Sequence, residues 1–152
     1  MDDYEVKVKD TSDGNKKISA RGESWSELFQ ACAAALTETM VDMSTIDPGF
    51  DQEVELERED PAELLFDFLT EVVLGMKEDR GFVLTAFDIE VSEDGTKLTG
   101  TVSGEELNPS KHHVHTAVSE ISFDDFIAEK EDDPPEDYTD MPYMASAKLI
   151  CM

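Results

Sequence analysis

Basic residues are scarce in this chain of 152 residues. Twelve Lys and Arg stand against 37 Asp and Glu, which gives a formal net charge of −25 at pH 7. Because proteins bind a phosphate backbone mainly through Lys and Arg, this composition argues against direct binding of DNA or RNA. Three explanations of the acidity stay open: a halophilic, salt-adapted surface, a partner protein with a basic face, and mimicry of a nucleic acid. The acids are spread along the chain rather than gathered in a tail, which favours the salt-adapted surface.

Cysteine is also scarce, and long apolar runs are absent. Cys32 and Cys151 are the two cysteines, and no C-x-x-C pair is present, so we expect reduced thiols rather than a disulfide framework. No apolar run approaches the roughly 18 residues that cross a bilayer, and the acidic start MDDYE lacks the pattern of a signal peptide. We therefore expect a cytoplasmic protein without a membrane partner, folded as one domain over residues 1–152.

The motifs of common enzyme sites are missing as well. The sequence has no G-x-S-x-G elbow, no P-loop, no dinucleotide fingerprint and no EF-hand loop. Cys32 belongs to an apolar helix face, and Cys151 has no identifiable activating base. The carboxylates cannot be paired into a general acid and a general base from the sequence, which disfavours a hydrolase. The residues by themselves favour a binding protein over an enzyme.

Two segments have the periodicity of amphipathic helices. The first starts with a capping box formed by Ser24 and Glu27 and ends near Asp42, and the second starts after Asp60 and closes near Gly75. The apolar residues expected on their inner faces are Trp25, Leu28, Phe29, Cys32, Ala33, Leu36 and Met40 in the first helix, and Leu64, Leu65, Phe68, Leu69, Val72 and Val73 in the second. Each apolar stripe needs a sheet or another helix to cover it.

Alternating apolar and polar residues predict strands around these helices. A polar turn at 10–14 joins the first two strands, a loop is expected at 105–113, and the acidic, proline-containing segment 131–142 is predicted to be a solvated loop. The predicted strands are residues 4–9, a short strand around Ile18 and Ala20, and residues 52–58, 82–91, 97–102, 114–127 and 143–151. This order predicts an α+β fold, in which a mixed or mostly antiparallel sheet has both helices packed on one face.

Two polar clusters are candidates for binding a metal. The first turn offers Asp10 and Asp13, whose carboxylates are hard oxygen ligands of the kind that Mg²⁺, Mn²⁺ or Ca²⁺ prefer. Acidic residues beside a glycine more often only hold a turn. His112, His113 and His115 form an H-H-x-H run, and on a strand the last two would share a face and reach one transition metal. No further ligand of matching spacing accompanies them, so histidines without a metal are the simpler interpretation.

Several short motifs follow one another in the order found in a known family. They are Thr11-x-Asp13 before a short strand, Leu28-Phe29-Gln30-Ala31-Cys32-Ala33 and Met40-Val41-Asp42 in the first helix, Leu64-Leu65-Phe66-Asp67-Phe68-Leu69-Thr70-Glu71 in the second, and Gly104-Glu105, Asn108-Pro109, Lys111-His112 and Thr116-Ala117-Val118 in the late loop and strand. In this order the chain resembles the archease family over most of residues 4–127.

The resemblance implies a small α+β protein that is not an enzyme and assists the tRNA-splicing RNA ligase. That ligase uses GTP and a divalent metal to guanylylate its own histidine before it seals RNA, and archease-like proteins speed the guanylylation and restore turnover. The implied partner is therefore the ligase, a protein, and not the RNA itself. A compact acidic module is suited to dock on a basic ligase surface. We expect a monomer or a weak oligomer.

The resemblance also implies a divalent-metal site, for Ca²⁺, Mg²⁺ or Mn²⁺, at one end of the molecule. In this chain Asp13 would be its first ligand, helped by Asp10 and by the carboxylate of Met152. Cys151 stands at the position of the family's near-terminal aspartate. The hypothesis requires that the first hairpin and the end of the last strand meet at one rim of the sheet.

This chain departs from the family pattern at several of these positions. Asp10 replaces a histidine, Ser119 stands where the family has a functional lysine, and an ungapped comparison would put Asn15 rather than Asp13 at the acidic position. A second interpretation therefore stays open. In it the chain is a non-catalytic protein-binding or chaperone-like module of the same fold, without metal chemistry.

Overall fold

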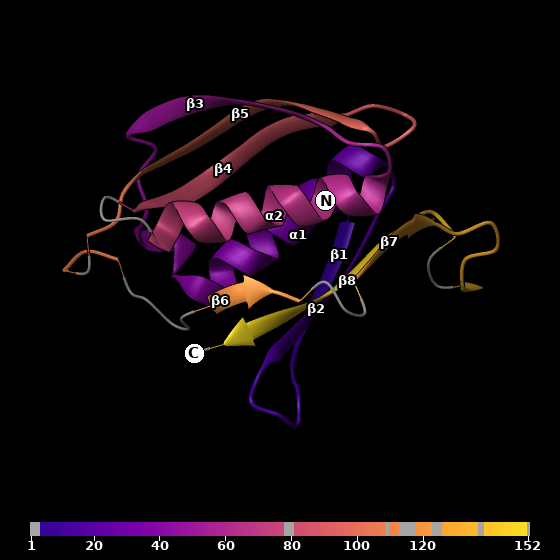
Figure 1. Ribbon diagram of the computed structural model, residues 1–152, viewed down its shortest axis with the longest axis horizontal. Helices are drawn as coiled ribbons and strands as arrows, with labels where there is room; N and C mark the ends of the chain where they lie inside the picture. Colours follow the sequence, from indigo (N-terminus) through magenta and orange to yellow (C-terminus); the bar gives the residue numbers. More distant parts are fainter. Residues whose placement is uncertain are drawn as a thin grey trace.

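The computed structural model describes residues 4–77, 81–108, 110–112, 118–122, 126–136 and 139–151. The elements, in chain order, are β1 (Tyr4–Asp10), β2 (Lys16–Gly22), α1 (Trp25–Met40), the short 3-10 helix η1 (Met43–Thr45), β3 (Phe50–Glu57), α2 (Pro61–Lys77), β4 (Phe82–Val91), β5 (Lys97–Glu106), β6 (Val118–Ile121), β7 (Ile127–Lys130) and β8 (Tyr143–Cys151) (Figure 1).

Helix α1 begins where its capping residues predict. The Ser24 hydroxyl accepts a hydrogen bond from the backbone N–H of Glu27 at 3.2 Å, and the Glu27 carboxylate accepts one from the backbone N–H of Glu23 at 3.0 Å. All the apolar residues predicted for the inner face of α1 are buried, and so are Ala31 and Ala35 on its other sides. The helix is therefore covered on more than one side.

The predicted α+β class is confirmed, but the prediction of a single sheet with both helices on one face is wrong, because the strands form two sheets. One sheet has the order β1-β2-β8-β6, with β7 also paired to β8, and the other has the order β3-β5-β4. The strand pairings in both sheets are antiparallel. The sequence pattern predicts most of the strands but does not say which sheet each one joins, because strand pairing joins residues far apart in the chain.

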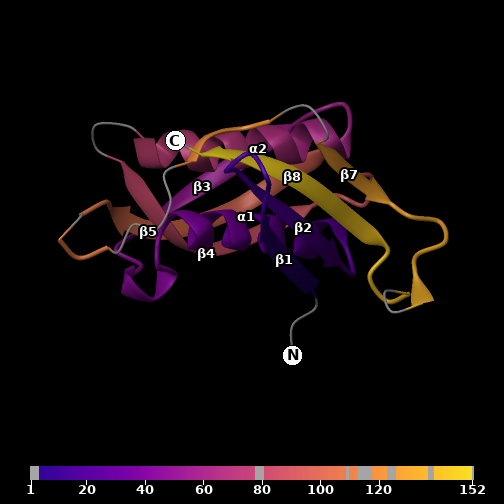
Figure 2. The same ribbon diagram turned by 90° about the horizontal axis from the view of Figure 1, so that it is seen from below.

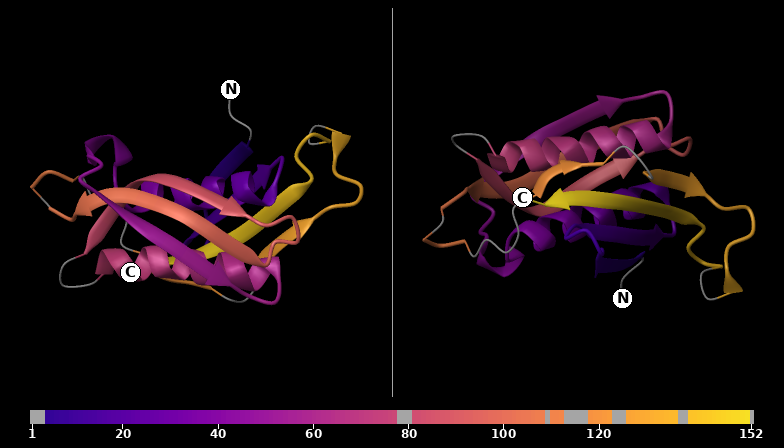
Figure 3. Two further views of the ribbon diagram at one scale, coloured as in Figure 1. Left: turned by 90° about the horizontal axis from the view of Figure 1, so that it is seen from above. Right: turned by 60° about the horizontal axis from the view of Figure 1, so that its bottom comes forward.

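Both helices lie between the two sheets (Figure 1 and Figure 3). Helix α1 contacts β1, β2 and β8 on one side and β4 on the other, while α2 contacts β6 and β7 on one side and β3 and β4 on the other. Ile18 and Ala20 of β2 and Ala145 and Ala147 of β8 are buried against this helical layer. The alanines of β2 and β8 leave room for α1 to pack on this sheet.

Some predicted boundaries need correction. Strand β5 runs to Glu106, so Glu105 is a strand residue and not part of a loop. The strand predicted at 114–127 is two short strands, β6 and β7, and residues 114–117 and 123–125 of that stretch lie outside the described residues. The final strand is confirmed as β8. Within the described part of the chain, no helix has the length and apolar character needed to cross a membrane.

Candidate functional site

The turn between β1 and β2 folds beside the end of β8. Strands β2 and β8 pair so that Lys16 lies opposite Leu149, and the backbone N–H of Cys151 donates a hydrogen bond to the side-chain oxygen of Asn15 at 2.9 Å. We call this region the hairpin corner and define it by Asp10, Asp13, Asn15, Lys148 and Cys151. Figure 2 shows the turn next to β8. The hairpin and the end of the last strand are thus brought together, as the metal hypothesis requires.

Asp13 is a charged, half-exposed carboxylate at this corner. The ammonium group of Lys148 lies 2.5 Å from Asp13 Oδ2, and the hydroxyl of Thr11 donates a hydrogen bond to Oδ1. These two donors hold the pKa of the Asp13 carboxyl well below its usual range, because both stabilise the ionised form. The Asp13 side chain is 48% exposed, so its free surface is open to a partner.

Asp10 also has a lysine counter-ion. Lys16 Nζ lies 2.6 Å from Asp10 Oδ1, and this contact raises the pKa of Lys16. The Asp10 side chain is 82% exposed, so the pair is well solvated and contributes little to stability. Each of the two carboxylates predicted to bind metal is therefore already next to an ammonium group.

The hairpin corner, as described, fits a divalent metal poorly. Among the described residues no group of three or more His, Cys, Asp or Glu side chains is arranged to hold a metal ion. The Cys151 thiol is 3.7 Å from the carbonyl oxygen of Leu149, and Met152, the remaining predicted ligand, lies outside the described residues. A cation at Asp13 would have to compete with the ammonium group of Lys148. Metal binding by Asp13, Asp10, Cys151 and Met152 stays a prediction.

Asn15 and Asp13 have different roles in this corner. The Asn15 side chain faces β8 and accepts the hydrogen bond from Cys151, whereas Asp13 is available to solvent. Of the two residues that compete for the family's acidic position, Asp13 is therefore the more exposed.

His112 is part of a separate, structural cluster. Its ring is buried, Nδ1 accepts a hydrogen bond from the backbone N–H of Asn108 at 2.8 Å, and Nε2 lies 2.7 Å from Glu105 Oε1. Both ring nitrogens are therefore engaged within the protein. His113 and His115, the pair expected to share a face, lie outside the described residues.

Lys148 is the functional candidate that the sequence did not reveal. Its position on the polar side of β8 follows from the alternation of that strand, but its contact with Asp13 joins residues 135 positions apart. Such a contact depends on the register between β2 and β8, which a single sequence does not show.

These features define a class of small α+β proteins, with two helices between two antiparallel sheets and a carboxylate held where the first hairpin meets the end of a late strand. The Archease protein family (MTH1598/TM1083) matches residues 8–136, and the chain belongs to this family. The archease of Thermococcus kodakarensis is 38% identical over 114 residues, which cover 74% of this chain and 80% of that protein.

Two solved structures have the same fold. The solution structure of protein 1598 of Methanobacterium thermoautotrophicum matches with a TM-score of 0.65 and 25% identity, and the match covers 99% of each chain. The crystal structure of an archease of Thermotoga maritima, described as a possible chaperone, matches with a TM-score of 0.53 and 17% identity over 89% of this chain and 86% of that one. The resemblance drawn from the sequence motifs is confirmed.

Proposed function

We propose that this protein is a non-catalytic activator of the tRNA-splicing RNA ligase. It raises the rate at which the ligase is guanylylated with GTP and a divalent metal, and it supports repeated turnover. Family membership supports the proposal, and the observation that carries it is the ionised, half-exposed carboxylate of Asp13 at the hairpin corner. The net charge of −25 favours encounter with a basic ligase surface.

The turn that carries Asp13 is held in place before any partner binds. The backbone N–H of Thr11 donates to the carbonyl oxygen of Asn15 at 2.8 Å, and Gly14 adopts a φ of 86°, which permits the tight turn. The bond from Cys151 to Asn15 fixes the turn to β8. A carboxylate on such a turn loses little conformational freedom when it meets a partner, so more of the interaction energy remains for binding.

Guanylylation of the purified ligase tests this proposal. We expect the wild-type protein to accelerate the reaction with GTP and Mn²⁺, and Asp13→Asn to reduce that acceleration about tenfold, which corresponds to roughly 1.4 kcal/mol. The control is Glu93→Gln, which removes an exposed acid from the turn between β4 and β5, and it should keep full activity. If the wild-type protein gives no acceleration at any KCl concentration, the proposal is wrong.

The metal is a second part of the proposal. We expect isolated protein to bind Mn²⁺, Mg²⁺ or Ca²⁺ weakly at Asp13, because Lys148 is a competing cation. Isothermal titration calorimetry should show tighter binding by Lys148→Met than by the wild type. The alternative function, a protein-binding or chaperone-like module without metal chemistry, is favoured by the lysine partners of Asp10 and Asp13. This alternative is the correct one if neither the wild type nor Lys148→Met binds metal while the wild type still binds the ligase.

A further inference from the structure

An open groove separates the C-terminal half of α2 from the inner face of the three-stranded sheet. Its volume is about 470 Å³. No residue of β3 is fully buried, although Val54 and Leu56 face the helical layer. The apolar side chains that line the groove include Val54, Phe68, Val72, Leu74, Phe82 and Val102. The sheet therefore offers apolar surface that the protein's own helices do not cover.

Two side chains at this groove are unusually exposed for their type. Leu74 is 51% exposed and Phe82 is 38% exposed, and only two other large apolar side chains of the described chain, Val8 and Ile127, are similarly open. The ring of Phe82 packs edge-on against Phe50 at a centroid distance of 4.9 Å, so it is held at the rim. Contact between these apolar groups and water is unfavourable, so a partner that covers them stabilises the complex.

Gly75 contributes the empty space beside Leu74. It lies within α2 and has no positive φ, so the backbone conformation does not require glycine. A Cβ built at this position would meet nothing within 4 Å, so packing does not require it either. Glycine lowers helix stability relative to alanine. Gly75 lines the groove, and its lack of a side chain leaves room there.

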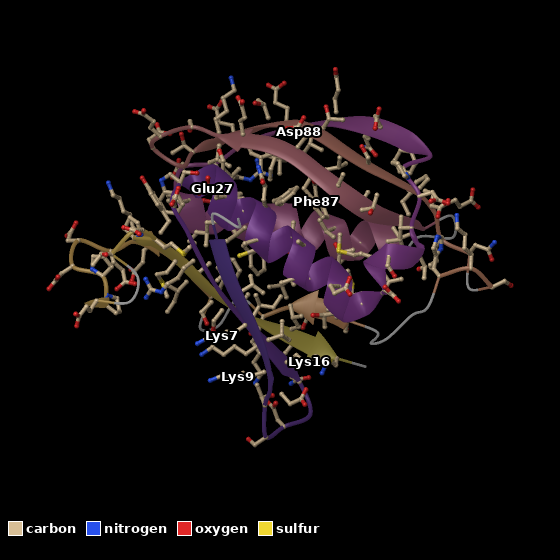
Figure 4. The ribbon with its side chains drawn as sticks, turned by 180° about the vertical axis from the view of Figure 1, so that it is seen from behind. Lys7, Lys9, Lys16, Glu27, Phe87 and Asp88 are labelled. Carbon is tan, nitrogen blue, oxygen red and sulfur yellow. The ribbon has the colours of Figure 1, made fainter. Side chains whose placement is uncertain are left out.

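The charges around the groove select the chemistry of its occupant. Glu71 is charged, and no basic residue is among the described residues that line the groove. The strands β3, β4 and β5 together carry eight acidic residues and one basic residue. On β3 and β4 these acids alternate with inward-facing apolar residues and so lie on the outer face of the sheet, as Asp88 does in Figure 4. The negative electrostatic potential from Glu71 and from the acidic sheet repels RNA and free fatty acids. It attracts a segment with Lys or Arg next to an apolar side chain.

We propose that this groove is the docking site for a basic segment of the partner protein, which inserts an apolar side chain beside Gly75 between Leu74 and Phe82. The inference rests on the proposed function, in which that partner is the ligase. The C-terminal half of α2 and the end of β8 lie toward the same end of the molecule (Figure 2). The groove lies on the side of α2 that faces the three-stranded sheet, whereas the hairpin corner belongs to the other sheet (Figure 1). A partner that contacts both must therefore reach past α2, and in this proposal the groove supplies affinity while Asp13 supplies activation.

Peptide binding tests the groove without the ligase. The probe is a fluorescently labelled amphipathic peptide built from Leu and Lys, and its Kd is measured by anisotropy. We expect Leu74→Ser and Gly75→Ile to weaken binding at least tenfold. The control is Val8→Ser, which removes an apolar side chain of similar exposure, 42%, from β1 in the other sheet, and its Kd should not change. A peptide with Ser in place of Leu that binds equally well would overturn the proposal, because charge alone would then explain binding.

Gly75→Ala separates docking from folding. Because space is free at this position, alanine should raise the Tm. The added methyl group should also narrow the groove and weaken binding of the peptide. A Tm that rises with unchanged Kd in both Gly75→Ala and Gly75→Ile would contradict the proposal. Self-association of the wild-type protein that the Leu74→Ser variant abolishes, measured by sedimentation, would assign the groove to a second copy of the chain and also contradict it.

Assays with the ligase distinguish failure of the groove from failure of the proposed function. Gly75→Ile should raise the protein concentration needed for half-maximal guanylylation at least tenfold and leave the maximal rate unchanged, since Asp13 is intact. If the wild type stimulates the ligase and Gly75→Ile stimulates it equally at every concentration, the groove proposal fails and the function stands. If the wild type gives no stimulation while the peptide results hold, the function fails and the groove binds another basic partner.

Discussion

Glu105 joins three segments of the chain through one carboxylate. It accepts a hydrogen bond from the backbone N–H of Asp47 at 3.0 Å, lies 2.8 Å from Lys111 Nζ, and contacts His112 Nε2 at 2.7 Å. Lys111, followed by the other two donors, lowers the pKa of Glu105 from its ordinary value of 4.5 to about 2. The cluster fixes the end of β5 to the turn before β3.

The pKa of Glu105 predicts how acid affects stability. Because the folded pKa lies below the unfolded one, the contribution of Glu105 is complete above about pH 4.5 and is lost as the pH falls toward 2. We expect Glu105→Gln to have a lower Tm than the wild type at pH 7, and the difference to shrink between pH 4.5 and 2. Thermal melts followed by circular dichroism give this comparison, with Glu106→Gln, an exposed neighbour, as the control. A difference in Tm that stays constant down to pH 2 would contradict this account.

The sequence predicts the roles of individual residues better than it predicts their contact partners. Asp13 was identified as a candidate from its turn, and Cys32 as a core residue from its helix face; burial raises the pKa of the Cys32 thiol to about 12, so it stays protonated at neutral pH. The partners of Asp13 and Glu105 were not identified, because Lys148 and Asp47 lie far from them in the chain.

Among the elements, helices were predicted to within about two residues, since capping and 3.6-residue periodicity are local properties. The strands were also found, but their division into two sheets was not. One indication was present: α1 has small apolar residues on more than one side, which fits a helix covered by two layers. The groove beside α2 depends on how tightly that helix approaches β3, and no sequence pattern expresses that distance.

Strands β1, β2 and β8 place three lysines side by side. Lys9 lies opposite Lys17, and Lys17 lies opposite Lys148. Lys7 and Lys9 point away from the helices, whereas Lys16 points to the other side (Figure 4). Like charges directly opposite one another destabilise a sheet by up to about 1 kcal/mol per pair. Of these three lysines, Lys148 is the one whose charge is balanced by an ion pair with Asp13.

We therefore expect Lys17→Thr to raise the free energy of unfolding by about 0.5 kcal/mol at low salt, because it removes two like-charge contacts and introduces a residue favoured in strands. Urea denaturation measures the change, and molar KCl should reduce it. The matched control is Lys97→Thr in β5, where the lysine lies opposite Glu57 and its loss should lower stability instead. Equal effects of the two substitutions would contradict the role of the lysine row.

The whole molecule has its charge divided unequally between the two sheets. The five strands of the first sheet carry seven basic and four acidic residues, whereas the second sheet is strongly acidic. With a net charge of −25, repulsion among carboxylates outweighs the local repulsion among the lysines. Screening relieves that repulsion.

Stability of the wild-type protein should consequently increase with salt. We expect the Tm to rise as KCl goes from millimolar to molar concentration, with NaCl giving a similar rise if charge screening is the cause. Differential scanning calorimetry over this range provides the measurement. A Tm that is flat or falls with salt would count against the salt-adapted surface inferred from composition.

The position of β8 has a consequence for how the chain folds. This strand pairs with β2, β6 and β7, and its pairing with β2 joins Gly22 to Tyr143, 121 residues later. While the ribosome is still making the intervening segment, the first hairpin has no neighbour on one edge, and α1 has only part of its cover. Closing so large a loop is slow, and exposed strand edges invite aggregation in the meantime. The lysines of β1 and β2 are charges of the kind that oppose association of strand edges, so we expect them to limit aggregation of the hairpin until β8 completes the sheet.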